Sequence, residues 1–229
     1  MCDSAAPDEM IASRGLSIPL DRDVLSPRLI RNLKNQVYEK KESDAITNLM
    51  RPDDVVMELG GGIGYISSLA AKRCHKGEVH SFEANPHLIP FIKRGHAGNN
   101  LTNVHVNNAL LGPQPGSTTF YVRRNLLASS MDRMDGTKII SEEQIEIRDA
   151  RSESQRMKPT ILICDIEGAE QMVIPLLDLS TVRSAVIELH PQWIGADGVH
   201  AVFQAMMDAG LVYAARRSVA KVVCFKRNF

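Results

Sequence analysis

One short loop carries the residue types most suited to ligand binding. Four glycines, Gly60, Gly61, Gly62 and Gly64, lie between an apolar strand-like segment and an apolar helix-like segment, and Glu58 precedes them. Glycine has no Cβ atom, so a loop of this composition lets a ligand approach the backbone closely. A plain strand-to-helix turn would not need four glycines in five positions, and the spacing therefore predicts a ligand-binding loop.

The spacing of these glycines separates three kinds of site. A dinucleotide fingerprint needs a glycine at the position that Tyr65 occupies, and no Gly-Lys-Ser/Thr follows to make a phosphate-binding Walker loop. An acidic residue followed by G-x-G-x-G is similar to motif I of the S-adenosylmethionine-dependent methyltransferases with the Rossmann-like fold. In that setting Glu58 would bind the ammonium of the methionine end, directly or through water.

Two further positions suit the adenosine part of the same cofactor. Glu83 ends the next predicted strand, where a carboxylate can accept hydrogen bonds from both ribose hydroxyls. Asn107, Asn108 and Ala109 follow the third predicted strand, and we expect Asn108 with the backbone of Ala109 to bind the adenine edge. Alternatively, Asn107 and Asn108 are asparagines that only form the turn after the strand.

A second acidic group lies in the stretch ILICDIEGAE. Asp165, Glu167 and Glu170 stand where a buried strand passes into a helix. Capping of the helix N-terminus explains Glu167 or Glu170. It does not explain Asp165, which is placed at the carboxyl edge of the sheet, where open α/β folds bind their ligands. His190 ends the following strand and is predicted to face the same crevice.

Taken together, these pieces resemble the FkbM-type methyltransferases. Tyr38 and Glu39, the glycine loop, FEANP, DIEGAE and IELH occur in the order of that family, and the resemblance runs from about residue 38 to the C-terminus. It implies a class I methyltransferase fold and methyl transfer, usually to a hydroxyl of a sugar or natural-product scaffold. It also implies that Tyr38 and Glu39 close over the S-adenosyl-L-methionine.

An alcohol is a poor nucleophile, so O-methylation needs a base or a metal to remove its proton. His190 is a candidate base because its neutral form is available near physiological pH. Asp165, Glu167 and Glu188 are the other candidates. Asp165 and Glu167 also suit Mg²⁺, but a carboxylate pair facing substrate hydroxyls would look the same. We expect no obligatory metal.

The remaining pattern predicts an α/β fold with a doubly wound, mostly parallel seven-stranded sheet and an antiparallel hairpin at the C-terminal end. Residues 1–52 are predicted to be a tail followed by a helical lid, and residues 53–229 to be the Rossmann-like domain. Residues 111–159 are mostly polar and are predicted to be an insertion over the ligand pocket or, alternatively, a surface excursion. The expected strands are 54–59, 78–84, 102–110, 160–166, 184–190, 211–217 and 220–226, and the expected helices are 25–38, 39–50, 65–73, 85–100, 168–179 and 197–210.

The composition of the chain limits which binding partners and which cellular compartment we expect. The 27 basic residues equal the 27 acidic ones, which gives no reason to expect nucleic acid or an anionic membrane as a partner. The 4 cysteines are scattered, and the first ten residues lack the order of a secretory signal. We therefore expect a cytoplasmic protein with a small hydroxylated substrate. No feature of the sequence selects an oligomeric state.

Two rival functions share part of these features. A nicotinamide-dependent oxidoreductase would also use Glu83, but it lacks the third glycine and a hydride-transfer site. A non-catalytic S-adenosylmethionine-binding protein would keep Glu58, Glu83 and the glycines. It would need neither the acidic stretch nor His190, and the sequence therefore favours methyl transfer.

Overall fold

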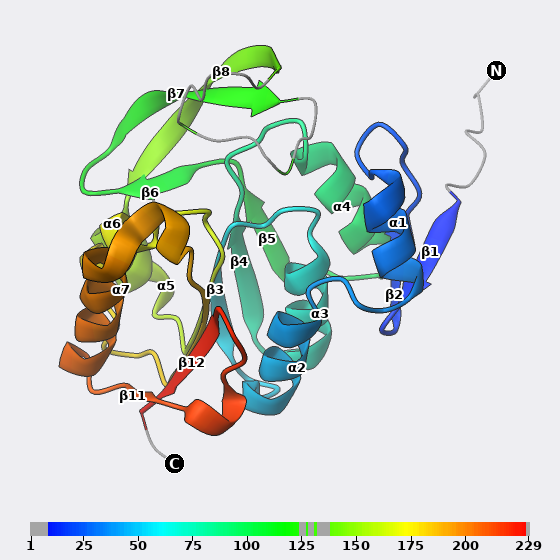
Figure 1. The fold of residues 1–229 in the computed structure, drawn as a ribbon. Coiled ribbons are helices and arrows are strands. Elements are labelled where there is room, and N and C mark those ends of the chain that lie inside the picture. Colours follow the sequence, from blue (N-terminus) through cyan, green and yellow to red (C-terminus); the bar gives the residue numbers. More distant parts are fainter. Residues whose placement is uncertain (1–8, 124–126, 128–130, 132–137, 228–229) are drawn as a thin grey trace.

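The computed structural model describes residues 9–123, 127, 131 and 138–227 (Figure 1). Its main sheet has seven strands in the order β11-β12-β10-β9-β3-β4-β5. The five strands from β10 to β5 are parallel, and β12 runs antiparallel to both of its neighbours. The predicted doubly wound sheet with an antiparallel C-terminal pair is confirmed. Its strands are β3 (Val55–Leu59), β4 (Glu78–Phe82), β5 (Val104–Asn107), β9 (Ile161–Cys164), β10 (Ser184–Glu188), β11 (Val212–Tyr213) and β12 (Val222–Lys226).

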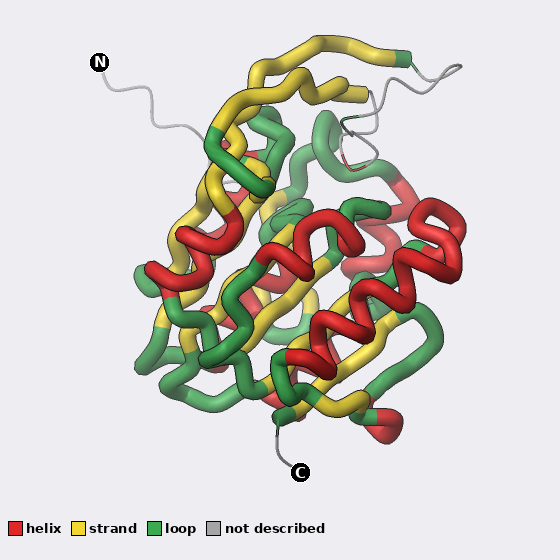
Figure 2. Tube along the Cα trace, turned by 90° about the vertical axis from the view of Figure 1, so that its left-hand side faces the viewer, coloured by secondary structure: helices red, strands yellow, loops and turns green. Residues whose placement is uncertain are grey.

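Helices cover both faces of this sheet (Figure 2). The central strands are apolar at successive positions, so each sends alternate side chains into two separate cores. In β3, Val56 belongs to the core under the N-terminal helices, whereas Met57 belongs to the core on the opposite face. The first face carries α1 (Pro27–Lys34), α2 (Lys40–Leu49), α3 (Tyr65–Arg73) and α4 (Ile89–Gly98), and the other carries α5 (Ala150–Met157), α6 (Glu170–Val173), the 3₁₀ turn η2 (Ile174–Leu176) and α7 (Pro191–Asp208).

The helix boundaries follow from capping residues and prolines. Ser26 caps α1 by accepting a hydrogen bond from the backbone N–H of Leu29, with Pro27 at the first helical position as expected. Pro90, which we expected inside a helix over 85–100, instead lies at the start of α4. The helix expected over 168–179 is shorter, because Pro175 falls in the 3₁₀ turn that follows α6.

The N-terminal segment differs from the expected tail. Residues from 10 to 19 form an antiparallel hairpin of β1 (Met10–Ser13) and β2 (Leu16–Pro19). Arg14 and Gly15 both have positive φ, as a two-residue hairpin turn requires. Ile11, Leu16 and Ile18 are buried in the same core as α1 to α4. The hairpin is held by this apolar face, so residues 10–19 are not the mobile tail that was one of the two expectations for this segment, the other being a strap.

The segment expected as an insertion over 111–159 is more regular than its polar composition indicated. It contains β6 (Leu110–Gly112), β7 (Gly116–Arg123) and β8 (Ile139–Asp149), which form a second sheet in the order β6-β8-β7. Since β6 begins just after β5 ends, this sheet starts at the carboxyl edge of the main sheet, at the top of Figure 1. Helix α5 belongs to the main fold, so the added part ends near residue 149. Residues 124–137, apart from 127 and 131, lie outside the described part of the chain.

Candidate active site

The glycine loop joins β3 to α3 and is packed between the ends of β4 and β9. The backbone N–H groups of Gly60 and Gly61 both donate to the carbonyl oxygen of Phe82 at 3.0 Å. Gly60 has φ +88°, and a Cβ atom there would lie 1.7 Å from the carbonyl oxygen of Asp165. Glycine is therefore required at position 60, and the loop brings the ends of three neighbouring strands together.

Glu83 is the side chain that fixes this loop. Its carboxylate accepts hydrogen bonds from the backbone N–H groups of Gly62 and Asn85, each at 2.7 Å. Burial raises the pKa of Glu83 to about 7, although these N–H donors oppose the shift. Its position at the end of β4 agrees with the ribose site predicted for it. The ribose role stays a prediction, and the observed role is to hold the loop.

Asn108 supports the same strand end. Its amide nitrogen donates to the carbonyl oxygens of Glu83 and Ala84, each at 2.9 Å. Ala109 beside it is buried. The amide nitrogen of Asn108 is therefore engaged within the protein, and its side chain braces the segment that carries Glu83. Binding of the adenine edge by Asn108 and Ala109 remains a prediction.

A small cleft lies beside the loop, at the carboxyl ends of β3, β9 and β10. No lysine or arginine is among the described residues that line it. Both carboxylate oxygens of Glu58 are buried there, and neither has a hydrogen-bond partner of normal geometry in the described part of the chain. Burial raises the pKa of Glu58 to about 8 and the charge of Glu83 adds to the shift, while the nearby Ser81 and Ser67 oppose it. We call this cavity the acidic cleft, and its five carboxylates are Glu39, Glu42, Glu58, Asp165 and Glu188.

The segment before α2 closes one side of the acidic cleft. Glu39 lines the cleft, and the ring of Tyr38 meets the ring of Tyr65 edge-on with centroids 5.2 Å apart. Burial raises the pKa of Glu39 well above its usual range, and the carboxylates of Asp165 and Glu42 raise it further. Of the predicted pair, Glu39 reaches the same cleft as the glycine loop, and Tyr38 packs against Tyr65.

The other acidic stretch assembles around His190, which is 4% exposed. Nδ1 of His190 lies 2.5 Å from a carboxylate oxygen of Glu170, whose side chain is fully buried. Nε2 lies 3.2 Å from Glu167 and 3.7 Å from Asp165. Burial alone would lower the pKa of His190, but the hydrogen bond that its Nδ1 donates to Glu170 and the charges of Glu167 and Asp165 raise it. The three predicted residues Asp165, Glu167 and His190 thus form one cluster.

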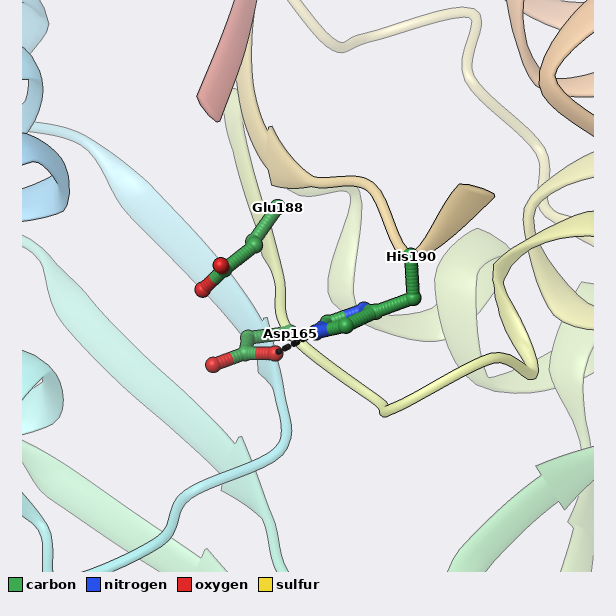
Figure 3. Close-up of side chains that lie close together, drawn as sticks. All are labelled: Asp165, Glu188 and His190. Atoms are coloured by element: carbon green, nitrogen blue, oxygen red, sulfur yellow. Dashed lines mark ion pairs between the residues drawn. The ribbon is translucent and has the colours of Figure 1, made fainter. Parts of the chain in front are cut away.

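Asp165 joins this cluster to the acidic cleft. Burial raises the pKa of Asp165 to about 7, and the carboxylates of Glu188 and Glu167 add to the shift while His190 opposes it. Asp165, Glu188 and His190 place one oxygen or nitrogen each within 4.8 Å of one another. Figure 3 shows the ring of His190 directed at Asp165, with Glu188 entering from the neighbouring strand.

Sequence reasoning missed two contributors to the site. Glu170 seemed explained as a helix-capping residue, and only the fold shows it buried against His190. Glu42 lies three residues after Glu39 in the chain, and such spacing in a helix places two side chains on the same face. Glu188 was named only as a further candidate base. It lies two residues before His190, and the alternation of a strand signals that both point the same way.

A family model, the methyltransferase FkbM domain, matches residues 54–213. The chain belongs to the FkbM methyltransferase family. It is thus an S-adenosylmethionine-dependent methyltransferase, as the motifs had indicated. The match includes the glycine loop, Glu83 and the cluster at His190, and ends where β11 ends. No match is found among curated proteins.

Several solved structures are similar to this chain in fold alone. The putative transferase PH0793 from Pyrococcus horikoshii is 14% identical, with a TM-score of 0.53 over 96% of this chain and 71% of that one. The precorrin-6y C5,15-methyltransferase from Geobacter metallireducens is 13% identical, with a TM-score of 0.48 over 82% and 84% of the two chains. TYW2 from M. jannaschii, solved with AdoMet, is 12% identical, with a TM-score of 0.46 over 96% and 87%.

The residues of this FkbM methyltransferase fit the cofactor of its family. The unpartnered carboxylate of Glu58 offers an acceptor to an ammonium group, and the glycines leave backbone open beside it. Partly buried Glu39 offers a second acceptor from the opposite wall of the acidic cleft. In the described part of the chain, no helix is both long and apolar enough to span a bilayer.

Proposed function

We propose that this methyltransferase transfers the methyl group of S-adenosyl-L-methionine to a hydroxyl oxygen of a small molecule, of the sugar or natural-product type. The observation that carries the proposal is the cluster of Asp165, Glu167 and His190 beside the glycine loop. A hydroxyl must lose a proton before or during methylation, and these are the groups able to take it. A protein that only binds the cofactor would not need them.

On the cofactor side, we assign each predicted residue a role. Glu58 and Glu39 bind the ammonium, Gly60 to Gly64 lie against the methionine and ribose, and Glu83 accepts from the ribose hydroxyls while it holds Gly62. Asn108 and the backbone of Ala109 border the adenine. Tyr38 completes the wall, and the segment before α2 acts as the lid over the cofactor. The closeness of Glu39 and Glu58 in one cleft supports this assignment.

On the acceptor side, the chain's task is to hold the hydroxyl in line with the methyl group and to remove its proton. S-adenosylmethionine supplies an electrophilic methyl on a sulfonium. The acceptor oxygen forms a bond to the methyl carbon as the carbon–sulfur bond breaks, and the electron pair of that bond leaves with the sulfur. The proton of the hydroxyl goes to Asp165, Glu167 or His190. Asp165, at the end of β9, joins the two sides of the site.

A small acceptor is favoured over a nucleic acid by the balance of charge. Binding to a phosphate backbone depends on many lysine and arginine contacts. This chain has equal numbers of basic and acidic residues, and the acidic cleft is lined by carboxylates. A polyanion would be repelled from such a cleft, whereas a neutral polyol or a cationic acceptor would not.

Calorimetry with S-adenosylmethionine and with NAD tests the first half of the proposal. We expect the methyl donor to bind and NAD not to bind. Glu83→Ala should weaken donor binding at least about tenfold, because the N–H groups of Gly62 and Asn85 lose their acceptor. Glu153→Ala should bind as the unaltered protein does, because Glu153 pairs with Arg156 on α5 and does not line the acidic cleft.

Transfer of labelled methyl to a panel of polyols, phenols and amines tests the second half. Labelling of hydroxyl compounds that falls at least about a hundredfold in His190→Gln would support the assigned chemistry. Labelling of amines alone would overturn the hydroxyl acceptor but keep the methyltransferase. Binding of NAD in place of S-adenosylmethionine would overturn both halves.

A further inference from the structure

Three side chains at the strand ends are arranged like the ligands of a metal ion. Asp165 comes from the end of β9, Glu188 from the end of β10, and His190 from two residues beyond. One oxygen or nitrogen of each lies within 4.8 Å of the other two (Figure 3). Ligands about 2.1 Å from a Mg²⁺ ion lie up to about 4.2 Å apart across an octahedron. Small side-chain rotations would therefore bring all three atoms to one ion.

Buried carboxylates without partners point to a missing cation. Oδ1 of Asp165 and both oxygens of Glu58 are buried and accept no hydrogen bond in the described part of the chain. Glu58 is 1% exposed and lines the same acidic cleft as Asp165 and Glu188. Burying a carboxylate without a compensating charge or hydrogen bond is costly, so such groups are normally found beside a cation.

S-adenosylmethionine alone does not balance the charge of this cleft. Its ammonium, sulfonium and carboxylate sum to a single positive charge, whereas five carboxyl groups line the acidic cleft. Glu58 and Glu39, whose protonated forms are favoured by burial, lie on the side of the glycine loop and of α2, where the ammonium is assigned. Asp165 and Glu188 lie at the neighbouring strands, and His190 lies 3.7 Å from Asp165. A second cation would occupy their side of the cleft.

His190 is held as metal-binding histidines are held. Its Nδ1 lies 2.5 Å from the buried carboxylate of Glu170, which also accepts from the backbone N–H of Gly168 at 3.1 Å. A carboxylate behind one ring nitrogen fixes the proton there and leaves the other nitrogen with a lone pair. That other nitrogen, Nε2, is the one directed at Asp165.

We propose that Asp165, Glu188 and His190 bind one divalent cation of the Mg²⁺ or Mn²⁺ class, with Glu170 orienting His190 behind it. Two carboxylates and one imidazole suit such an ion, which keeps further positions for water or an acceptor oxygen. The inference rests on the proposed function, since it names how that site prepares its acceptor. It departs from the expectation from sequence that no metal is obligatory.

The cation would also decide among the three candidate bases. With Asp165 and His190 as ligands, Glu167 is the remaining group, and its exposed carboxylate lies 3.2 Å from Nε2 of His190. A hydroxyl oxygen bound to a divalent cation loses its proton more readily. The proton would then go to Glu167, while the oxygen attacks the methyl carbon. An acceptor with two adjacent hydroxyls would suit the site best, because both oxygens can bind one ion.

Titration with Mn²⁺, followed by the paramagnetic resonance signal of the free ion, tests the proposal without any acceptor. We expect one Mn²⁺ per chain, displaced by excess Mg²⁺. Glu188→Gln and Asp165→Asn should each weaken binding more than about tenfold, and Glu170→Gln about tenfold through His190. Glu153→Gln is the matched control, because Glu153 pairs with Arg156 on α5 and does not line the acidic cleft. Circular dichroism and S-adenosylmethionine calorimetry on each variant would verify that it is folded.

The outcomes separate this proposal from the function on which it rests. Mn²⁺ binding that is absent, or equal in all variants, would overturn the cation site even if S-adenosylmethionine binds normally. Loss of Mn²⁺ binding in the variants of Glu188, Asp165 and Glu170, with binding retained in the control, would support the cation site. Mn²⁺ binding by a protein that does not bind S-adenosylmethionine would overturn the proposed function and leave the cation site standing.

Discussion

The glycine loop and the acidic cleft lie side by side at one edge of the sheet, yet their polar groups are satisfied in different ways. Around the loop, Glu83 accepts hydrogen bonds from two backbone N–H groups, and Asn108 donates hydrogen bonds to two carbonyl oxygens. In the cleft, both oxygens of Glu58 and Oδ1 of Asp165 lack a hydrogen bond of normal geometry in the described part of the chain, although Asp165 lies 3.7 Å from His190. The loop is complete by itself, whereas the cleft is arranged for charges that come from ligands.

At this edge of the sheet, the residues that stabilise the fold therefore differ from the residues that bind ligands. A satisfied buried hydrogen bond stabilises the fold modestly, and removing one partner costs the desolvation of the other. An unsatisfied buried carboxylate destabilises the fold until a cation arrives. We therefore expect substitutions in the loop to damage both folding and cofactor binding. Substitutions in the cleft should weaken ligand binding while folding improves or stays unchanged.

The largest effect is expected from Gly60→Ala. The new Cβ atom would lie 1.7 Å from the carbonyl oxygen of Asp165, at a φ of +88° that alanine rarely adopts. The loop must shift, at a cost of about 3 kcal/mol or more in the free energy of unfolding, and S-adenosylmethionine binding should be lost. Urea unfolding and calorimetry measure the two effects. Gly116→Ala is the control, because no atom lies within 4 Å of its added Cβ. Equal stability of the two variants would contradict the close packing of the loop.

The second prediction concerns Glu58 and pH. The pKa of Glu58 is about 8 in the folded protein, above its value of about 4.5 in the unfolded chain. Between these values the folded protein keeps a proton that the unfolded chain releases, so the free energy of unfolding falls as pH rises from about 4.5 to 8. Glu83, with a pKa of about 7, acts in the same direction. We expect the unliganded protein to be less stable at pH 8 than at pH 5 by at least about 2 kcal/mol.

Glu58→Gln isolates the contribution of this one carboxyl group. The variant should lose the share of the pH dependence that Glu58 contributes, while the shares of Glu83 and Asp165 remain, and it should be as stable as the unaltered protein, or more stable, at pH 8. It should bind S-adenosylmethionine about tenfold more weakly, because the ammonium loses an ionised partner. Urea midpoints at pH 5 and pH 8 measure the first effect. An unchanged dependence on pH would show that Glu58 is not the group that titrates.

Sequence alone was sufficient where the chemistry is local. The glycine loop, its carboxylate and Glu83 are each recognisable from a few adjacent residues, and the alternation of strands and helices indicated a doubly wound, mostly parallel sheet. Glu170 was missed as a partner of His190 because the two lie 20 residues apart in the chain and meet only across the packed ends of α6 and β10. A helix start accounts for an acidic residue by itself, so nothing local revealed the contact.

The N-terminal hairpin shows a different kind of miss. Its signals were present, since Ile11 and Leu16 to Ile18 follow an alternating pattern around the two-residue turn Arg14–Gly15. The strands are only four residues each, and a two-stranded hairpin is not stable by itself. It forms because its apolar face packs into the core of α1 to α4. Such dependence on tertiary packing is invisible to a local pattern.

The smallest effect is expected from Asn108→Ala, which removes the brace behind Glu83. Two hydrogen bonds from its amide nitrogen to Glu83 and Ala84 are lost, which should cost about 1–2 kcal/mol in the free energy of unfolding. Because Glu83 then holds the loop less firmly, S-adenosylmethionine should bind a few-fold more weakly. Asn48→Ala is the control, since Asn48 makes one exposed hydrogen bond to the backbone of Asp44 within α2.

The size of the Asn108 effect also distinguishes a brace from a direct contact with adenine. If Asn108 is a brace that acts through Glu83, Asn108→Ala should weaken the binding of S-adenosylmethionine and of a truncated ligand without adenine by the same factor. A contact to the adenine edge should weaken only the intact cofactor. If the brace acts only through Glu83, the double variant Asn108→Ala with Glu83→Ala should bind S-adenosylmethionine as weakly as Glu83→Ala alone does. Additive losses would instead place Asn108 in contact with the cofactor, independently of the loop.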